Sequence, residues 1–197
     1  MSAMQVVPVS LVGRGVRLEP FQPAHTEGLW RVAEPGFFTL FPAPPRAWTI
    51  GEFGAWLDEI ARRPSWCPFT TILQATGQPV GLTCYLDIRP ADRGLEIGST
   101  WIARAHQGTL VNPEAKYLLL RHAFETLGAI RVQLKTDRRN VHSQRAIAKL
   151  GALREGVLRK HVIMADGYCR DSVMFSITDD EWPAVKAGLE ARLGYVP

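Results

Sequence analysis

The sequence predicts a single domain of the α/β class, built on one mixed sheet. Runs typical of antiparallel strands occur in the first half of the chain and again near its end, and one strand–helix–strand segment between them is typical of a parallel crossover. The chain has 197 residues, of which 46% are hydrophobic, enough for one packed core without metal or disulfide. We therefore expect residues 1–197 to form one domain with an antiparallel meander, a central βαβ crossover and a C-terminal hairpin.

The first half of the chain predicts strands and helices that precede and build the meander. Phe53, Trp56, Leu57 and Ile60 recur at the spacing of one helix face and predict a helix over Gly51–Arg62. The other expected elements are a strand at Val16–Phe21, a helix at Pro23–Ala33, and meander strands at Phe69–Gln74, Val80–Ile88 and Leu95–Ile102. The aromatic and proline-rich segment Phe37–Pro45 is expected to be an irregular loop, which either packs on the core or forms a wall of a substrate cleft.

The second half predicts the crossover and the hairpin. Asn112 as a cap, Pro113 at the first helical position and Gly128 as a stop predict a helix from about Asn112 to Leu127. The remaining expected elements are a strand at Ile130–Asp137, a helix at Val141–Leu150, hairpin strands at Val157–Met164 and Tyr168–Ile177 joined by Asp166-Gly167, and a helix at Asp179–Leu193.

Composition excludes some classes of protein. The longest apolar runs, such as Leu118–Leu120, are only a few residues long, so we expect no membrane association and a cytoplasmic location. Three cysteines form no disulfide framework, which fits a reducing compartment, and five histidines show no ligand spacing, so we expect no metal. The net charge of +4 contains no block of like charges; it is weak evidence for nucleic acid and fits a pocket for a polyanionic small molecule equally well.

The segment before the central helix is the first candidate for chemistry. It runs from Gln107 to Asn112 through Gly108 and opens a helix N-terminus. The first amides of a helix lack intrahelical partners and attract anions, so a pyrophosphate would fit there. The alternative is that Gly108-Thr109 is merely a tight connection.

A second segment follows the crossover, with Asn140, Ser143, Lys149 and Gly151 in the pattern Asn-x-x-Ser followed by Lys-x-Gly. The earlier segment reads Gln-Gly-Thr-x-x-Asn-x-Glu-Ala-Lys over residues 107–116, and the final hairpin carries Asp-Gly at 166–167 and Arg-Asp at 170–171. Together these motifs resemble the GNAT superfamily of acyl-CoA-dependent N-acyltransferases, most closely the branch of Rim-type ribosomal-protein N-terminal acetyltransferases. The resemblance extends from about Val16 to Ile177.

The resemblance implies that acetyl-CoA lies between two strands that splay apart, the third meander strand and the strand after the central helix. It implies pantetheine contacts from the backbone around Ile102 and Ala103, and pyrophosphate contacts from Gln107, Gly108, Thr109, Leu110, Val111 and Asn112. Asn140 would bond a pantetheine amide, or would instead cap the next helix. Most nearby cations, Lys116 among them, are expected to form a solvated face. The superfamily pattern has glycine at the position of Leu110, where a side chain would cost about 1 to 2 kcal/mol if φ were positive.

The reaction requires removal of a proton from an amine and protonation of a thiolate. Many superfamily members use a tyrosine as the acid where this chain has Ile147. The resemblance to the Rim-type branch, whose members use the serine of Asn-x-x-Ser near the sulfur, implies that Ser143 is the better candidate; the alternative is a first-turn serine without a catalytic part. Glu96 lies on the third meander strand in the alternating set with Gly98 and Thr100. Several superfamily members use a carboxylate on this strand as general base, often through water, so the resemblance implies that Glu96 is the candidate base; the alternative is a solvent-facing residue. Asp137 and Asp87 are weaker alternatives.

These motifs predict direct transfer of an acetyl group from acetyl-CoA to an amine, either a small molecule or a protein N-terminus. The first alternative is a CoA-binding regulatory or degenerate module without turnover, which Leu110 and the missing tyrosine would favour. The second is a small basic nucleic-acid-binding protein, which no aromatic-basic motif supports. The acceptor and the oligomeric state, a homodimer included, stay open.

Overall fold

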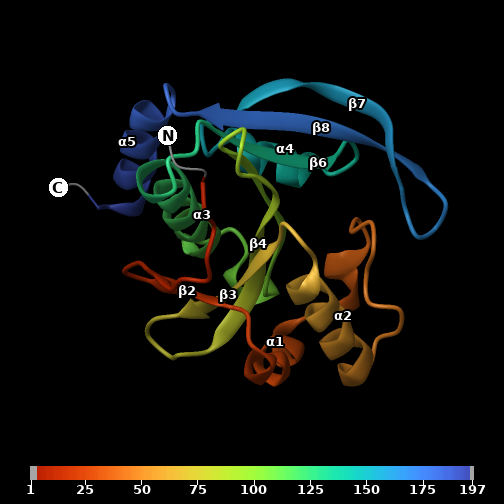
Figure 1. Cartoon of the computed structure of the whole chain (residues 1–197). Helices are drawn as coiled ribbons and strands as arrows, with labels where there is room; N and C mark the ends of the chain where they lie inside the picture. Colours follow the sequence, from red (N-terminus) through yellow and green to blue (C-terminus); the bar gives the residue numbers. More distant parts are fainter. Residues whose placement is uncertain (1–3, 196–197) are drawn as a thin grey trace.

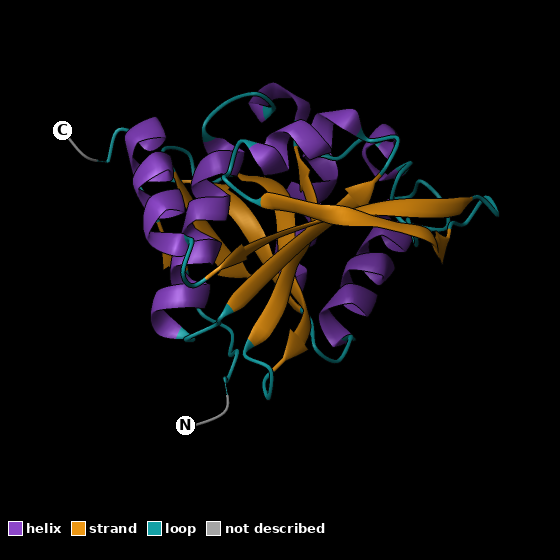
Figure 2. Ribbon diagram, turned by 90° about the horizontal axis from the view of Figure 1, so that it is seen from above, coloured by secondary structure: helices purple, strands orange, loops and turns teal. Residues whose placement is uncertain are grey.

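Residues 4–195, which the computed structural model describes, build one mixed sheet with helices on both faces (Figures 1 and 2). Eight strands follow the order β1-β2-β3-β4-β5-β6-β8-β7, and only β5 and β6 pair in parallel. The strands are β1 (Leu11–Val12), β2 (Val16–Pro20), β3 (Cys67–Leu73), β4 (Pro79–Arg89), β5 (Gly94–Ile102), β6 (Arg131–Asp137), β7 (Leu153–Ile163) and β8 (Cys169–Thr178). The predicted fold class is confirmed.

The helices divide between the two faces of the sheet. Those that pack together on one face are α3 (Val111–Arg121), α4 (Val141–Ala148) and α5 (Trp182–Leu193), and those on the other are α1 (Thr26–Val32) and α2 (Ile50–Arg62) (Figure 1). Short turns η1 (Pro23–His25), η2 (Pro35–Phe38), η3 (Arg104–His106) and η4 (His122–Thr126) join the larger elements. Among residues 4–195, no helix has both the length and the apolar character that crossing a membrane requires.

Each face of the sheet has its own apolar core because β4 is buried along most of its length on both sides. Tyr85 packs with the α3 and α5 side, whereas Leu82, Cys84 and Leu86 pack with α1 and α2. Strand alternation produces this division, since successive side chains point to opposite faces. The site described below therefore lies between two separately packed layers.

The starts of α1, α3 and α5 differ from the sequence prediction. Helix α1 begins at Thr26 and not at Pro23, because residues 23–25 form the 3₁₀ turn η1. Helix α3 begins at Val111 with Leu110 as its cap residue, so Asn112 lies inside the first turn and does not cap the helix. The reason is that the Glu114 amide already bonds the Leu110 carbonyl at 2.9 Å, which starts the helical ladder two residues early. Helix α5 begins at Trp182, because the residues from Thr178 to Glu181 form a turn closed by the Glu181 amide on the Thr178 carbonyl.

Some strands and helix ends also differ. Strand β1 was not predicted, β7 begins at Leu153 rather than Val157, and Ile130 lies outside β6 and is exposed. The predicted long helix ends as α3 at Arg121 and continues as the π-helical turn η4. The loop predicted over Phe37–Pro45 is irregular apart from η2 at its start.

A bulge in β5 changes the face of its last residues. Leu82 pairs with Trp101 and Cys84 pairs with Gly98, so two residues of β5 oppose one residue of β4, and Ser99 has a φ of 47°. Trp101 consequently packs with the α2 layer, while Thr100 turns towards α3. The prediction that Thr100 shares a face with Glu96 is therefore wrong beyond the bulge.

Strands β5 and β6 separate after a short parallel ladder. They pair only at Gly94 with Arg131, Leu95 with Val132 and Glu96 with Gln133. Beyond Glu96, β5 stays on β4 and β6 stays on β8, so the two strands diverge. The opening predicted by resemblance exists, and Glu96 stands at its vertex.

Candidate functional site

The divergence of β5 and β6 opens into a cleft of about 800 Å³ that reaches both layers of the molecule. Its walls come from residues 36–43 before α2, from β5, from the loop before α3, from β6 and α4, and from the β7–β8 hairpin. The candidate residues Glu96, Gln107, Asn140 and Ser143 all line it. One cleft thus brings together the two predicted motif segments.

The loop from Gln107 to Leu110 presents unbonded backbone amides. Gly108 has a φ of 76°, a left-handed angle that favours glycine, and no atom lies within 4 Å of where a Cβ would stand. Within residues 4–195, the amides of Gly108, Thr109 and Leu110 donate no hydrogen bond. The Thr109 hydroxyl donates to the His106 carbonyl at 2.7 Å and accepts from the Val111 amide at 3.3 Å, which holds the loop in shape. Three donors beside a helix N-terminus suit an anion.

Leu110 does not strain this loop. Its φ is −78°, an ordinary value for any residue, and its side chain is 49% exposed. The expected conformational cost of a side chain at this position therefore does not arise. The position that requires glycine is Gly108.

The predicted pantetheine contacts at the end of β5 are partly used within the chain. The Ala103 amide donates to the Val80 carbonyl at 2.8 Å, and its carbonyl accepts from His106. The Gln107 side chain donates to the Ile102 carbonyl at 2.9 Å. The Ala103 amide and one lone pair on each of the two carbonyls are therefore already used within the chain, and Gln107 links the end of the strand to the loop.

Asn112 lies in the cleft wall with an unused acceptor. Its Oδ1 atom is buried and has no hydrogen-bond partner within residues 4–195. A buried acceptor without a donor is costly unless a ligand or water supplies one. Asn112 therefore belongs to the candidate site by geometry, although it does not cap the helix.

Lys116 is buried, contrary to the expectation of a solvated face. Its Nζ donates to the hydroxyls of Thr83 at 2.9 Å and Thr100 at 2.6 Å, and these hydroxyls also lie 2.8 Å apart. Burial lowers the pKa of Lys116 to about 7, against a small opposing effect of Cys84. The β5 bulge creates this position, because it turns Thr100 towards α3.

Asn140 caps α4 and keeps a free donor. Its Oδ1 accepts from the Ser143 amide at 2.9 Å, whereas its Nδ2 makes no hydrogen bond with residues 4–195. The Ser143 hydroxyl likewise has no partner among these residues. Both lie at the cleft. The capping interpretation of Asn140 is correct, and its Nδ2 can still donate to a ligand.

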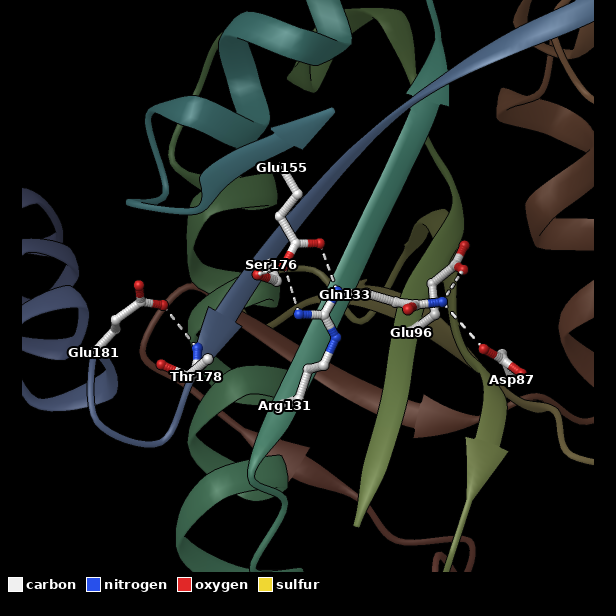
Figure 3. Close-up of polar contacts among 8 residues, drawn as sticks. All are labelled: Asp87, Glu96, Arg131, Gln133, Glu155, Ser176, Thr178 and Glu181. Carbon is white, nitrogen blue, oxygen red and sulfur yellow. Dashed lines mark hydrogen bonds and ion pairs between the residues drawn. The ribbon is translucent and has the colours of Figure 1, made fainter. Parts of the chain in front are cut away.

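The vertex of the cleft holds a carboxylate in a polar network (Figure 3). Glu96 is 3% exposed; its Oε2 accepts from Lys135 Nζ at 2.6 Å and from Gln133 Nε2 at 3.0 Å. Gln133 also donates to Asp87 at 3.0 Å. The other oxygen of Glu96 accepts no hydrogen bond within residues 4–195, and a Cβ on Gly98 would stand 3.1 Å from it. Glu96 is thus buried, not solvent-facing, with one oxygen available.

The weaker alternatives to Glu96 differ in environment. Asp137 is bonded by the Arg139 amide at 2.7 Å and by its guanidinium at 3.0 Å. Burial alone would raise the pKa of Asp137, but these bonds and the charge of Arg139 leave it lowered. Asp87 is 46% exposed on its side chain and does not line the large cleft. Glu96 therefore has the best position of the three for accepting a proton in the cleft.

The aromatic segment before α2 both packs and lines the cleft. Phe38 is 2% exposed among neighbouring rings, whereas Phe37 and Phe41 face the cleft. Phe37 stacks on Trp101 with ring centres 6.1 Å apart. The segment therefore packs on the core through Phe38 and forms part of the cleft wall through Phe37 and Phe41, and its contact with a substrate stays a prediction.

The cleft also contains polar residues that were not predicted as part of the site. Arg170 of β8 and His161 of β7 line it, and His161 Nδ1 lies 3.0 Å from the Ser172 hydroxyl. The Arg-Asp motif at 170–171 was a signal for Arg170, and strand alternation places Arg170 and Ser172, two residues apart, on one face of β8. The register that carries β8 beside β6 cannot be read from the motifs.

Comparisons with known proteins agree with this geometry. The sequence model of the acetyltransferase (GNAT) domain matches residues 16–153. A candidate acetyltransferase from T. thermophilus is 42% identical, with 96% of this chain and 100% of that chain covered and a TM-score of 0.90. A GCN5-related N-acetyltransferase from Brucella melitensis is 31% identical, with 96% and 87% covered and a TM-score of 0.90.

A more distant structure shares the fold. Mycobacterium smegmatis RimJ, solved in complex with CoA-disulfide, is 23% identical, with 95% of each chain covered and a TM-score of 0.77. The comparison with curated proteins gave no significant match.

Proposed function

Because the chain belongs to the GNAT acetyltransferase family and is an acetyl-CoA-dependent N-acetyltransferase, we propose that it transfers the acetyl group directly to a primary amine, of a small molecule or a protein N-terminus. The observation that carries this proposal is the opening between β5 and β6 beside a loop with three unbonded amides. The RimJ structure with CoA-disulfide is a relative of the same fold and supports a CoA site here.

The residues present fit acetyl-CoA. The amides of Gly108, Thr109 and Leu110 would hold the pyrophosphate, and the orphaned Asn112 Oδ1 would accept from the cofactor or a water on it. Asn140 Nδ2 would donate to a pantetheine carbonyl. When bound, the cofactor supplies an activated acetyl thioester. The edge of β5 beyond Glu96 is open for the pantetheine arm because β6 has left it.

Glu96 and Ser143 would handle the protons. An amine must lose a proton to attack, and the free oxygen of Glu96 accepts it directly or through water. Lys135 and Gln133 hold the other oxygen and so orient the carboxylate. The unpartnered Ser143 hydroxyl lies on α4 and would donate to the leaving thiolate.

Replacing Ser143 by Ala is expected to lower kcat by about 3- to 10-fold, because a thiolate with a pKa near 8.5 needs only modest help to leave. Steady-state release of CoA thiol measures this. The dissociation constant for acetyl-CoA should stay within about threefold in the same variant. An unchanged kcat would remove Ser143 from the mechanism and leave it a first-turn serine.

Replacing Gly108 by Ala is expected to weaken CoA binding by about 5- to 10-fold, because a Cβ at a φ of 76° costs about 1 kcal/mol and shifts the loop amides. Leu110→Gly is the matched variant: since Leu110 has an ordinary φ, its affinity should change by less than about threefold. Calorimetric titration of both variants with CoA compares them. A larger effect at Leu110 than at Gly108 would contradict this loop geometry.

The proposed function is tested by two measurements on the full chain. Acetyl-CoA should raise the melting temperature, and a panel of primary amines should include substrates that release CoA thiol. Binding without release for every amine would favour the alternative of a degenerate CoA-binding module. The absence of binding would overturn the cofactor site itself.

A further inference from the structure

A buried arginine in the cleft has no hydrogen-bond or ion-pair partner among the residues that the structure describes. Arg170 of β8 is 6% exposed and lines the cleft. Its Nε is buried without a hydrogen-bond partner, and none of its side-chain nitrogens donates a hydrogen bond or joins an ion pair within residues 4–195. Buried charges are normally paired, so this guanidinium is a feature that folding alone does not explain.

The nearby carboxylates do not satisfy Arg170. Asp137 and Glu96 are the opposite charges that act on it most, but each is bonded to another cation. Asp137 accepts from Arg139, and Glu96 accepts from Lys135 at 2.6 Å. Burial lowers the pKa of Arg170 despite these charges, yet a guanidinium still stays protonated in a protein. The Arg170 guanidinium is therefore a buried cation whose N–H donors have no acceptor among residues 4–195.

The position of Arg170 points to the acceptor amine and not to the cofactor. On β6 and β8, Leu134 and Val173 belong to the core under α3 and α4, where the cofactor residues lie. Lys135 and Met174 pair on the opposite face, and Arg170, an even number of residues from Met174, shares that face. Glu96, the proposed base, contacts Lys135 there. Arg170 thus lies on the side from which an amine would approach Glu96.

Two further nitrogen-bearing side chains, Lys135 and His161, line this part of the cleft. Lys135 is already paired with Glu96, and burial together with the charges of Lys135 and Arg170 lowers the pKa of His161. The unpaired positive charge is therefore that of Arg170. A guanidinium presents planar, paired N–H donors that match the two oxygens of a carboxylate. A neutral carbonyl would accept one or two of these bonds but would leave the charge uncompensated.

We propose that Arg170 binds a carboxylate of the acceptor, so that the preferred substrates are amines that carry a carboxylate close to the amino group. This inference rests on the proposed function, because it assigns the substrate class of the same cleft. The carboxylate belongs either to a small amino acid or to an acidic side chain next to the N-terminus of a peptide. The chemistry at Arg170 is the same in both.

Matched pairs of amines test the proposal with the full chain and acetyl-CoA. One arm compares β-alanine with β-alaninamide and 4-aminobutyrate with its amide. The other compares amidated tripeptides that begin Ser-Asp and Ser-Asn. Each kcat/KM is divided by the fraction of the compound whose amine is uncharged, so that the comparison does not depend on the pKa of the amine. The carboxylate member should have a kcat/KM about 10- to 100-fold above its amide in at least one arm, which identifies the source. Equal use of both members in both arms overturns the proposal.

The variant Arg170→Met should remove this preference. We expect the carboxylate member to lose about 10- to 100-fold in kcat/KM, mainly through KM, while the amide member changes by less than about threefold. Arg131→Met is the matched control: Arg131 lies on neighbouring β6 but pairs with Glu155 at 2.6 Å outside the cleft, so the preference should persist. An equal loss on both members in Arg170→Met overturns the proposal.

Two further measurements are needed. The first distinguishes carboxylate binding by Arg170 from a purely structural role of this residue, and the second tests carboxylate binding even if the protein transfers no acetyl group. Removal of an uncompensated buried charge should raise the melting temperature of the free protein, whereas a structural arginine would lower it when replaced. If no amine supports turnover, the same pairs are titrated into the protein by calorimetry. Carboxylate-selective binding that Arg170→Met abolishes supports the inference although transfer fails, and its absence overturns the inference.

Discussion

Replacement of Glu96 by Gln is expected to lower kcat by about 10²- to 10³-fold, in the lower part of the range of about 10²- to 10⁴-fold that a general base contributes. Gln keeps the shape and the contact with Gln133 but cannot accept the proton of the amine. Affinity for acetyl-CoA should change by less than about threefold, because Glu96 faces the layer opposite α3 and α4. Steady-state kinetics with a saturating amine and calorimetry with CoA measure the two quantities.

The matched control is Glu155→Gln. Glu155 is also a strand carboxylate that pairs with a cation, Arg131, and accepts from Ser176, but it lies outside the cleft (Figure 3). Its replacement should leave kcat within about twofold. If both variants lose activity equally, the loss reflects disturbance of the sheet. If Glu96→Gln retains full kcat, another group or water accepts the proton.

Much of the fold could be predicted from the sequence because its signals are local. The helix face of Phe53, Trp56, Leu57 and Ile60, the Asp166-Gly167 turn and the stop at Gly128 each act over a few residues. Their order specifies a meander, a crossover and a hairpin. The strand order β6-β8-β7 depends on pairing between distant segments, which no local pattern encodes.

Beyond the β5 bulge, strand alternation no longer predicts which face of the sheet a side chain lies on. Nothing in the residues from Gly98 to Trp101 marks the extra residue, because Ser99 adopts its φ of 47° to suit the register with β4. The bulge decides the neighbours of Thr100 and Trp101 and hence the shape of the cleft wall. Bulges near functional sites commonly redirect side chains in this way.

The contacts of the motif residues show that some have polar groups open to the cleft and others bond only within the protein. Gly108 and Asn112 leave groups open to the cleft. Glu114 instead accepts from the amides of Arg14 at 2.6 Å and Val16 at 3.2 Å, and so holds the N-terminal turn on α3. A motif spacing specifies residue types but not whether each side chain serves a ligand or the fold.

Burial of Lys116, the last residue of that motif, lowers the free energy of unfolding by an amount that depends on pH. Burial lowers its pKa to about 7 in the folded chain, whereas an unfolded lysine titrates near 10.4. Between these values the unfolded chain binds more protons than the folded one, so the contribution of Lys116 to the free energy of unfolding rises with pH. The slope is at most about 1.4 kcal/mol per pH unit. Below pH 7 the full cost of the buried charge is present.

Lys116→Met is therefore expected to be more stable than the wild type below pH 7, with a difference that shrinks steadily between pH 7 and about 10. Thr83 and Thr100 remain satisfied because their hydroxyls bond each other at 2.8 Å. Urea unfolding at several pH values measures the difference. Lys186→Met is the control: Lys186 pairs with Glu125, which raises its pKa, so its replacement should add no slope in this window. A constant difference between Lys116→Met and the wild type would mean that the buried amine keeps its ordinary pKa.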